Sequence, residues 1–250
     1  MPNQTIVEKF RSARGDSSLA VLEGFHPLKH AIRFGAQLEL VVGVSLGELA
    51  DLGEEYGPDI ASVLKNQLTL VPHEIFRQLA PVPPPTGVIG IAMRPAASLT
   101  EMLGDHIQAP IVLLENPRNM LNIGAAIRVS AAAGAAGVIT TGNQDPWHPA
   151  AIIASAGLHY ALNVIRAQTL PKSDRPLVVI DPKGEPLGPG TIPTNAILAF
   201  GAERQGVTKD LIALADHCVS IPMCEGVSSL NLATAVAVVL YSWKLGNKQP

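Results

Sequence analysis

Short apolar runs alternate with amphipathic segments through the C-terminal half of the chain, and this alternation predicts an α/β fold. Continuous apolar runs bounded by turn residues are typical of strands buried on both faces. Strands that alternate with helices form a mostly parallel sheet with helices on both faces. The strands expected here are Pro110–Glu115, Val138–Thr141, Leu162–Ile165, Leu177–Ile180, Ala196–Phe200 and Cys218–Ile221. The expected helices are Ile123–Ala133, Ala150–Ser155, Lys209–Ala215 and Ser229–Lys244.

The N-terminal half predicts a smaller α/β domain. One helix is expected at His26–Gly35, where apolar residues follow a helical period and the segment ends on glycine. A second is expected at His73–Leu79, whereas the polar, acidic stretch that ends at Ser62 has no predicted element. The expected strands are Leu38–Val44, Leu68–Val71 and Val88–Met93, and Ala20–Gly24 is expected to be a short strand or a turn.

A change of pattern near the middle of the chain predicts a domain boundary. Pro81–Gly87 is rich in proline, and residues 94–109 hold turn residues with one short helical piece at Leu99–Leu103. We therefore expect one domain at residues 1–105, linker included, and a second at residues 106–250.

The composition is that of a globular protein. Hydrophobic residues make up 47% of the 250 residues and charged residues 16%, which provides ample core material. No apolar run reaches membrane-spanning length without a polar or turn residue. The N-terminus lacks a signal-peptide pattern, and Cys218 and Cys224 do not make a disulfide framework. We expect a cytoplasmic protein with free thiols and no membrane segment.

The charge leaves the question of nucleic-acid binding open. The formal net charge of −3 argues mildly against it, because phosphate binding requires Lys and Arg. A local basic cluster near the start, formed by Lys9, Arg11 and Arg14, can nevertheless bind RNA. The alternative for this cluster is a solvated surface segment.

Polar and glycine-rich residues follow the strand at Pro110–Glu115. Asn122 is well placed to cap the helix expected from Ile123, and Gly124 allows close backbone approach. Arg128 lies six residues after Asn122, so it can face back toward the end of the strand. The alternative is an ordinary capped helix with a surface arginine.

Two further segments place similar residues after strands. Gly201-Ala-Glu-Arg-Gln-Gly206 follows one strand, and Ile221-Pro-Met-Cys-Glu-Gly-Val-Ser-Ser-Leu-Asn231 ends another and opens a long apolar helix that Ser228 or Ser229 can cap. The carboxyl ends of parallel strands are where such sheets present their ligand sites. A plain turn and a capped core helix remain the alternatives.

The ordered triple of segments resembles the motifs of the SpoU family of RNA ribose 2′-O-methyltransferases. The resemblance is strong over residues 108–245. Two positions differ: Arg204 replaces a glycine of the family motif, and Glu225 lies where the family often has glycine. Glu23-Gly24 and Pro85-Thr-Gly-Val-Ile-Gly-Ile91 more weakly resemble the ribosomal-protein-like substrate-binding domain of many members.

This resemblance implies a cofactor, S-adenosylmethionine, and an rRNA or tRNA substrate. It also implies a homodimer and a C-terminal trefoil knot, with Arg128 both catalytic and in contact with RNA. The implied catalytic residues are Arg128, Asn122, Glu203, Ser229 and Asn231. The implied cofactor-binding residues are Gly201, Ile221, Met223, Leu230 and Thr140.

Two alternatives remain at the level of sequence. One is a non-catalytic RNA-binding relative with the same fold, and the other is a methyltransferase acting on a substrate other than RNA. Signatures of other classes are lacking: there is no dinucleotide-binding Gly-x-Gly-x-x-Gly, no phosphate-binding loop and no nucleophile elbow. His148 and His159 lack metal-ligand spacing with the cysteines, so we expect no metal.

Overall fold

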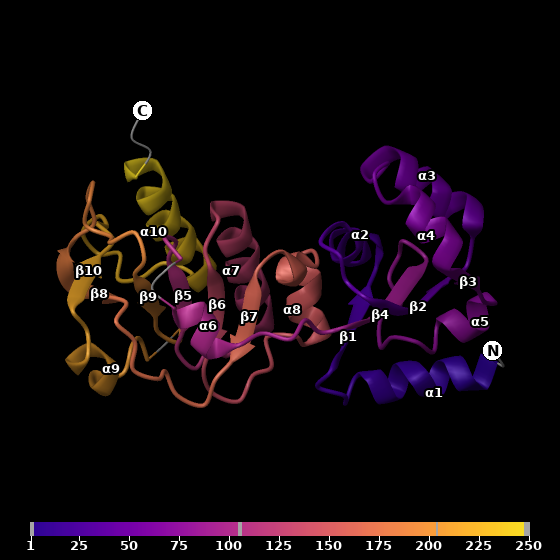
Figure 1. The fold of residues 1–250 in the computed structure, drawn as a ribbon, viewed down its shortest axis with the longest axis horizontal. Helices are drawn as coiled ribbons and strands as arrows, with labels where there is room; N and C mark the ends of the chain where they lie inside the picture. The colour runs from indigo at the N-terminus through magenta and orange to yellow at the C-terminus, as the bar shows by residue number, and fades with distance from the viewer. Residues whose placement is uncertain (1–2, 105–106, 204, 248–250) are drawn as a thin grey trace. The chain divides into compact units, whose positions relative to one another are not determined.

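The computed structural model describes residues 3–104, 107–203 and 205–247, and these form two units (Figure 1). Unit 1 consists of Met1–Ala96 together with Trp147–Ala161, and unit 2 of Ala97–Pro146 together with Leu162–Pro250. The expected single boundary after residue 105 does not describe this division, because a segment from the C-terminal half belongs to unit 1.

Unit 1 is built on a four-stranded mixed sheet with the strand order β1-β4-β2-β3. The central strand β4 is antiparallel to β1 and β2, whereas β2 and β3 are parallel. The strands are β1 (Leu19–Glu23), β2 (Leu38–Gly43), β3 (Leu68–Leu70) and β4 (Val88–Met93). The helices are α1 (Asn3–Ala13), α2 (Phe25–Arg33), α3 (Leu46–Tyr56), α4 (Ala61–Gln67), α5 (His73–Phe76), α8 (Pro149–Ala154) and the 3-10 helix Leu158–Ala161.

Three helices of unit 1 were not expected from the sequence. Helix α1 buries only Ile6, Phe10 and Ala13. Helix α3 lies in the polar stretch that had no predicted element, and α4 begins at the end of that stretch and continues to Gln67. Each presents a narrow apolar stripe to the core and a wide polar face to solvent. Such a stripe is a weak periodic signal in a polar segment.

The segment Trp147–Ala161 is held in unit 1 by specific contacts. The His30 Nδ1–H group of α2 donates to the Ala156 carbonyl at 2.6 Å, and the Tyr160 hydroxyl donates to the Met93 carbonyl at 3.2 Å. These long-range contacts have no local signature in the sequence.

Unit 2 contains a six-stranded sheet in which every neighbouring pair is parallel, which confirms the expected parallel-sheet fold. The strand order is β10-β8-β9-β5-β6-β7. The strands are β5 (Ile111–Leu114), β6 (Gly137–Thr140), β7 (Asn163–Arg166), β8 (Leu177–Pro186), β9 (Ile197–Phe200) and β10 (His217–Ser220). The helices are α6 (Leu99–Leu103), α7 (Met120–Ala133), α9 (Lys209–Ala213) and α10 (Leu232–Gly246).

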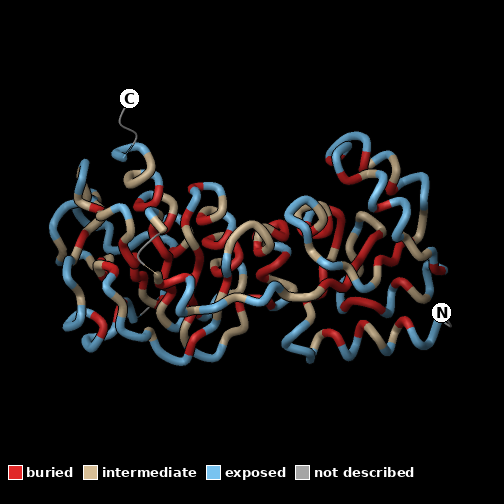
Figure 2. Tube along the Cα trace, in the orientation of Figure 1, coloured by how far each residue is buried: buried red, intermediate tan, exposed pale blue. Residues whose placement is uncertain are grey.

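The central strands of this sheet are buried on both faces (Figure 2). Leu113 and neighbouring strand residues pack with Met102 of α6 and Leu211 of α9 in one apolar cluster. Helices α7 and α10 pack against each other and bury residues such as Ile127 and Val236. Burial on both faces explains why these strands appear as continuous apolar runs.

Two helix caps differ from those expected. Helix α7 begins at Met120 and is capped by Asn119, whose Oδ1 accepts from the backbone N–H groups of Leu121 and Asn122 at 2.8 and 3.2 Å. The predicted cap, Asn122, therefore lies in the first turn, and its side chain is available for other partners. Helix α10 is likewise capped by Asn231 rather than by Ser228 or Ser229.

Candidate active site

Three loops of unit 2 begin at the carboxyl ends of parallel strands and meet at one edge of the sheet. The first connects β5 to α7, the second follows β9 from Gly201 to Gly206, and the third leads from β10 to α10. Strands β5 and β9 are direct neighbours, so the first two loops start side by side. This edge is the usual position of ligand sites in open parallel sheets.

A chain of side-chain hydrogen bonds joins the three loops. The Asn231 Nδ2 group donates to Asn122 Oδ1 at 2.9 Å, and Asn122 Nδ2 donates to Glu203 Oε1 at 2.9 Å. Asn231 simultaneously caps α10 through its Oδ1. The chain thus fixes the orientation of the Asn122 amide, since its oxygen and its nitrogen each have one suitable partner.

Glu203 is held as a carboxylate. Partial burial acts to raise the pKa of Glu203, but hydrogen bonds from Asn122 Nδ2 and from backbone N–H groups, including that of Arg118, outweigh it. The net effect holds the pKa of Glu203 below its ordinary value. The site therefore contains a fixed negative charge at neutral pH.

The loop after β9 is a tight turn. The Gly206 N–H group donates to the Ala202 carbonyl at 2.9 Å, and Gly206 has a φ of 66°. A Cβ atom at position 201 would overlap the backbone of Gly206 and Val207. Glycine is therefore required at position 201, because only glycine permits this approach of backbone to backbone.

A cavity of about 400 Å³ lies beside this turn. That volume falls within the range of small-molecule and cofactor sites. Predicted site residues that line it are Gly201, Glu203, Ile221, Met223, Ser229 and Leu230. The other lining residues are Ile180, Asp181, Pro182, Phe200, Ala202, Gln205, Gly206, Ser228, Leu232 and Ala235. Asn122 and Asn231 join this group through their bonds to Glu203 and to each other.

Two predicted residues lie apart from this cavity. Thr140 ends β6, which β5 separates from β9, and its buried hydroxyl has no hydrogen-bond partner within the described parts of the chain. It does not line the cavity, so the structure does not place it with the other candidate cofactor residues. Arg128 is exposed on α7, on a different face of the helix from Asn122.

The predicted RNA contacts of the N-terminal segment lie on or just after α1 in unit 1. Lys9 Nζ lies 3.2 Å from Glu39, and Arg14 lies 2.6 Å from Glu23 Oε1, an ion pair outside hydrogen-bond geometry. Arg14 also donates to the Leu79 carbonyl at 2.8 Å. Arg11, by contrast, is exposed. The basic cluster of the sequence is therefore partly neutralised by acidic neighbours.

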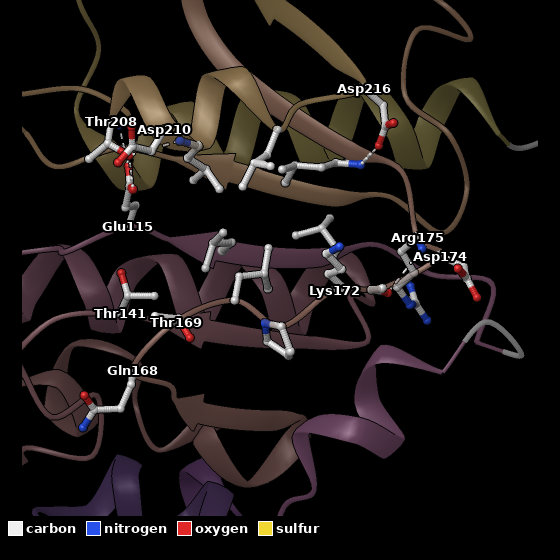
Figure 3. Close-up of a pocket in the computed structure, with 18 residues that line it drawn as sticks. Glu115, Thr141, Gln168, Thr169, Lys172, Asp174, Arg175, Thr208, Asp210 and Asp216 are labelled. Carbon is white, nitrogen blue, oxygen red and sulfur yellow. Dashed lines mark hydrogen bonds between the residues drawn. The ribbon is translucent and has the colours of Figure 1, made fainter.

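A second cavity in unit 2, of about 710 Å³, is larger but contains none of the predicted site residues (Figure 3). Several of its polar side chains form hydrogen bonds with other groups of the protein. Both oxygens of Glu115 accept from Thr208, and Asp216 accepts from the Leu177 N–H group. Arg175, only 2% exposed, donates to the carbonyl oxygens of Leu103, Ile107, Ala109 and Asn195. The smaller cavity is lined by residues of the second and third motifs, so it is the candidate active site.

Sequence reasoning missed Asp181, Gln205 and Arg118. Asp181 lines the cavity within β8, directly after an apolar run, and this position was a usable signal. Gln205 and Arg118 meet through a hydrogen bond of 3.3 Å from Arg118 Nη2 to Gln205 Oε1. They are 87 residues apart in the chain, so no local pattern could reveal their contact.

The fold and the site define an α/β enzyme with its cleft at the carboxyl ends of parallel strands. The model of the SpoU rRNA methylase family matches residues 109–241, which is more than half of the chain. The chain belongs to this family. The match confirms the family predicted from the three motifs and, with it, the class of RNA methyltransferases.

Similar proteins cover nearly the whole chain. An uncharacterized tRNA/rRNA methyltransferase from Synechocystis sp. is 29% identical over 88% of this chain and 82% of its own length. A 23S rRNA (adenosine(1067)-2′-O)-methyltransferase from Streptomyces laurentii is 27% identical over 95% and 90%. The SpoU methyltransferase AviRb from Streptomyces viridochromogenes, solved in complex with AdoMet, superposes with a TM-score of 0.76 at 22% identity over 96% of both chains. At this identity the structural likeness establishes the fold.

Neither a metal cluster nor a membrane segment is found among residues 3–104, 107–203 and 205–247. No group of three or more His, Cys, Asp or Glu side chains there is arranged to hold a metal ion. No helix in those ranges is long and apolar enough to cross a membrane.

Proposed function

We propose that this protein transfers a methyl group from S-adenosylmethionine to the 2′-hydroxyl of a ribose in rRNA or tRNA. The observation that carries the proposal is the hydrogen-bonded chain Asn231–Asn122–Glu203, placed beside the cavity at the carboxyl ends of the parallel strands. Family membership supports the reaction class, and the names of the relatives favour rRNA.

The lining of the smaller cavity fits S-adenosylmethionine. Apolar side chains of Ile221, Met223 and Leu230 suit the faces of an adenine ring. The carboxylates of Asp181 and Glu203 suit the positive sulfonium and ammonium groups. When bound, this cofactor supplies an electrophilic methyl group for an in-line displacement by an oxygen nucleophile.

The protein's own residues have separate roles in the reaction. Arg128 is not the base, because a guanidinium group is a poor proton acceptor. Its charge instead stabilises the alkoxide that develops on the ribose and the phosphate beside it, and this phosphate takes part in removing the hydroxyl proton. Glu203 and Asn231 hold the Asn122 amide in one orientation, so the polar groups of the site are fixed before substrate arrives.

We extend the proposal to a homodimer formed through α7 and α10. Val238, Tyr241 and Leu245 form an exposed apolar strip on α10, with Leu245 65% exposed. Lys244 Nζ donates to the Ala132 carbonyl of α7, a residue on the same helical strip as Arg128. A second copy seated on this face would bury the strip and enclose Arg128 within the site.

The dimer is tested by sedimentation equilibrium. Tyr241→Glu places a charge in the strip, and we expect it to yield monomers where the wild type is dimeric. Tyr56→Glu alters an exposed tyrosine of unit 1 and serves as the matched control. A Tyr241→Glu protein that stays dimeric would reject this face as the interface.

Three finer assignments complete the proposal. Unit 1 serves as the RNA substrate-binding domain, and the C-terminal chain of unit 2 forms a trefoil knot whose loops surround the cofactor. The reaction takes place in the cytoplasm, which agrees with Cys218 and Cys224 being free thiols.

The experiment that tests the function is transfer of radiolabelled methyl from S-adenosylmethionine to total rRNA and tRNA. Wild type is compared with Arg128→Ala, and Lys209→Ala removes an exposed positive charge elsewhere in unit 2 as a control. We expect label in RNA from wild type and Lys209→Ala but not from Arg128→Ala. RNA binding without transfer would support a non-catalytic relative, and transfer only to other acceptors, with no salt-dependent RNA affinity, would support a non-RNA substrate.

A further inference from the structure

We propose that Arg118 is an RNA-binding residue that contacts a phosphate next to the target ribose. This inference rests on the proposed function and adds a substrate contact to the same site. Arg118 lies in the loop between β5 and α7, which also carries the Asn119 cap.

The backbone before Arg118 is held in one conformation. Asn116 has a φ of 47°, in the left-handed region, and its N–H group donates to Thr141 Oγ1 at 3.0 Å. Pro117 is buried, and proline restricts its own φ. The loop therefore presents Arg118 from an anchored base, with its side chain exposed.

Arg118 touches the active-site cluster at two points. Its backbone N–H group donates to Glu203 Oε2 at 3.4 Å, and its Nη2 donates to Gln205 Oε1 at 3.3 Å. Both partners line the smaller cavity. The guanidinium therefore lies at the rim of the site, where the target ribose and its flanking phosphates must arrive.

The charge of Arg118 is not neutralised by a carboxylate within the described residues. By contrast, Lys9, Arg14 and Arg33 each form an ion pair with a carboxylate. Gln205 is neutral and occupies one of the five guanidinium N–H groups, which orients the side chain and leaves donors for a ligand. Arg175 is the contrast, because its donors are directed to buried carbonyl oxygens.

An exposed guanidinium at this position suits a phosphodiester. Two parallel N–H groups bind two phosphate oxygens in a geometry that lysine cannot reproduce. Each phosphate contact to a single strand also contributes about 0.7 to the slope of the logarithm of affinity against the logarithm of salt concentration. Arg118 should therefore determine the affinity for RNA without affecting the affinity for the cofactor.

The test measures steady-state methyl transfer to protein-free total rRNA and the equilibrium affinity for S-adenosylmethionine. We expect Arg118→Ala to raise KM for rRNA about tenfold, to change kcat less than about twofold and to lower the salt slope by about 0.7. Arg118→Lys should restore the salt slope but not the full KM. Lys209→Ala, which removes the same charge from α9, should leave KM unchanged.

Each other outcome has a definite meaning. If wild type is active and Arg118→Ala has a wild-type KM, or Lys209→Ala raises KM equally, the inference is overturned. A loss of cofactor affinity in Arg118→Ala would also overturn it, because the residue would then act on the cofactor site. If wild type transfers no methyl to any RNA, the proposed function fails instead, and the two failures are thereby distinguished.

Discussion

The two units use their polar side chains in opposite ways. In unit 2, Asn122, Glu203 and Asn231 come from distant parts of the chain and bond to one another beside a cavity. In unit 1, Lys9 and Arg14 form ion pairs with carboxylates of the same unit. Helix α3 adds further acidic residues, including Glu48, Glu54 and Glu55.

This difference shows what marks a functional site in this molecule. Positive charge in the sequence does not indicate an available cation, since a neighbouring carboxylate can occupy it. Polar groups that hold one another in a fixed geometry beside a cavity lined by the sequence motifs are a stronger sign of chemistry. Substitutions of Asn122, Glu203 or Asn231 in unit 2 should therefore affect catalysis, and those among the paired charges of unit 1 should affect stability.

Among the substitutions that test this comparison of the two units, the largest effect is expected from Asn122→Ala. The change removes both links of the chain, the acceptor for Asn231 and the donor to Glu203, and we expect kcat to fall about 100-fold by loss of preorganisation. Single-turnover methyl transfer measures this step directly. Asn143→Ala, at an exposed amide of the same unit, is the control and should retain full activity. If both variants lost methyl transfer equally, the hydrogen-bonded cluster would have no special role in catalysis.

The next effect concerns pH. Hydrogen bonds hold the pKa of Glu203 below its ordinary value, so the carboxyl binds a proton less readily when folded than when unfolded. Its contribution to stability is thus fully present above the unfolded pKa and is lost as pH falls through the folded pKa. We expect the activity of wild type to decline in that same acidic window. Glu203→Gln should lower kcat about tenfold and flatten this acid limb.

The pH profile is measured with cofactor and RNA both saturating, and far-ultraviolet circular dichroism follows folding over the same range. An unchanged acid limb in Glu203→Gln would assign the titration to another group. Retention of wild-type kcat would show that the carboxylate is not needed to orient Asn122.

The two units also differ in how far the sequence predicts them. The central strands of unit 2, β5, β6 and β9, were predictable because burial on both faces makes them continuous apolar runs. Helices α1 and α3 of unit 1 were not, because each buries only a narrow stripe. The inclusion of Trp147–Ala161 in unit 1 depends on contacts such as His30 to Ala156, which are 126 residues apart.

The candidate site shows the same limit on a smaller scale. Resemblance to a family identified Asn122, Glu203 and Asn231 as candidate catalytic residues. It did not predict the hydrogen bonds between them, which join positions 81 residues apart (Asn122 and Glu203) and 109 residues apart (Asn122 and Asn231). Asn122 was expected to cap α7, and Asn119 does so instead. Both asparagines are plausible caps by local chemistry, and the helix start decides between them.

A smaller effect is expected from Arg14→Ala in unit 1. The Arg14 and Glu23 side chains are 25% and 10% exposed, so the change leaves a largely buried carboxylate without its ion-pair partner. We expect a loss of about 1–3 kcal/mol in the free energy of unfolding, discounted for the partial exposure of Arg14. Denaturant unfolding measures this loss. A stable variant with weakened RNA binding would instead place Arg14 among the RNA contacts.

The smallest effect is expected from Arg11→Ala. This variant compares the contribution of α1 to RNA affinity with that of Arg118 at the rim of the cavity. Arg11 is exposed on α1, next to cations that are already paired. Removing one solvent-exposed phosphate contact should weaken rRNA binding only about twofold to threefold, with unfolding free energy unchanged within about 0.5 kcal/mol. Filter binding at two salt concentrations measures this loss, and steady-state KM for rRNA compares it with the tenfold rise expected for Arg118→Ala. If Arg11→Ala proved the more damaging of the two, α1 rather than the rim of the cavity would dominate RNA affinity, and the division of labour between the units would be reversed.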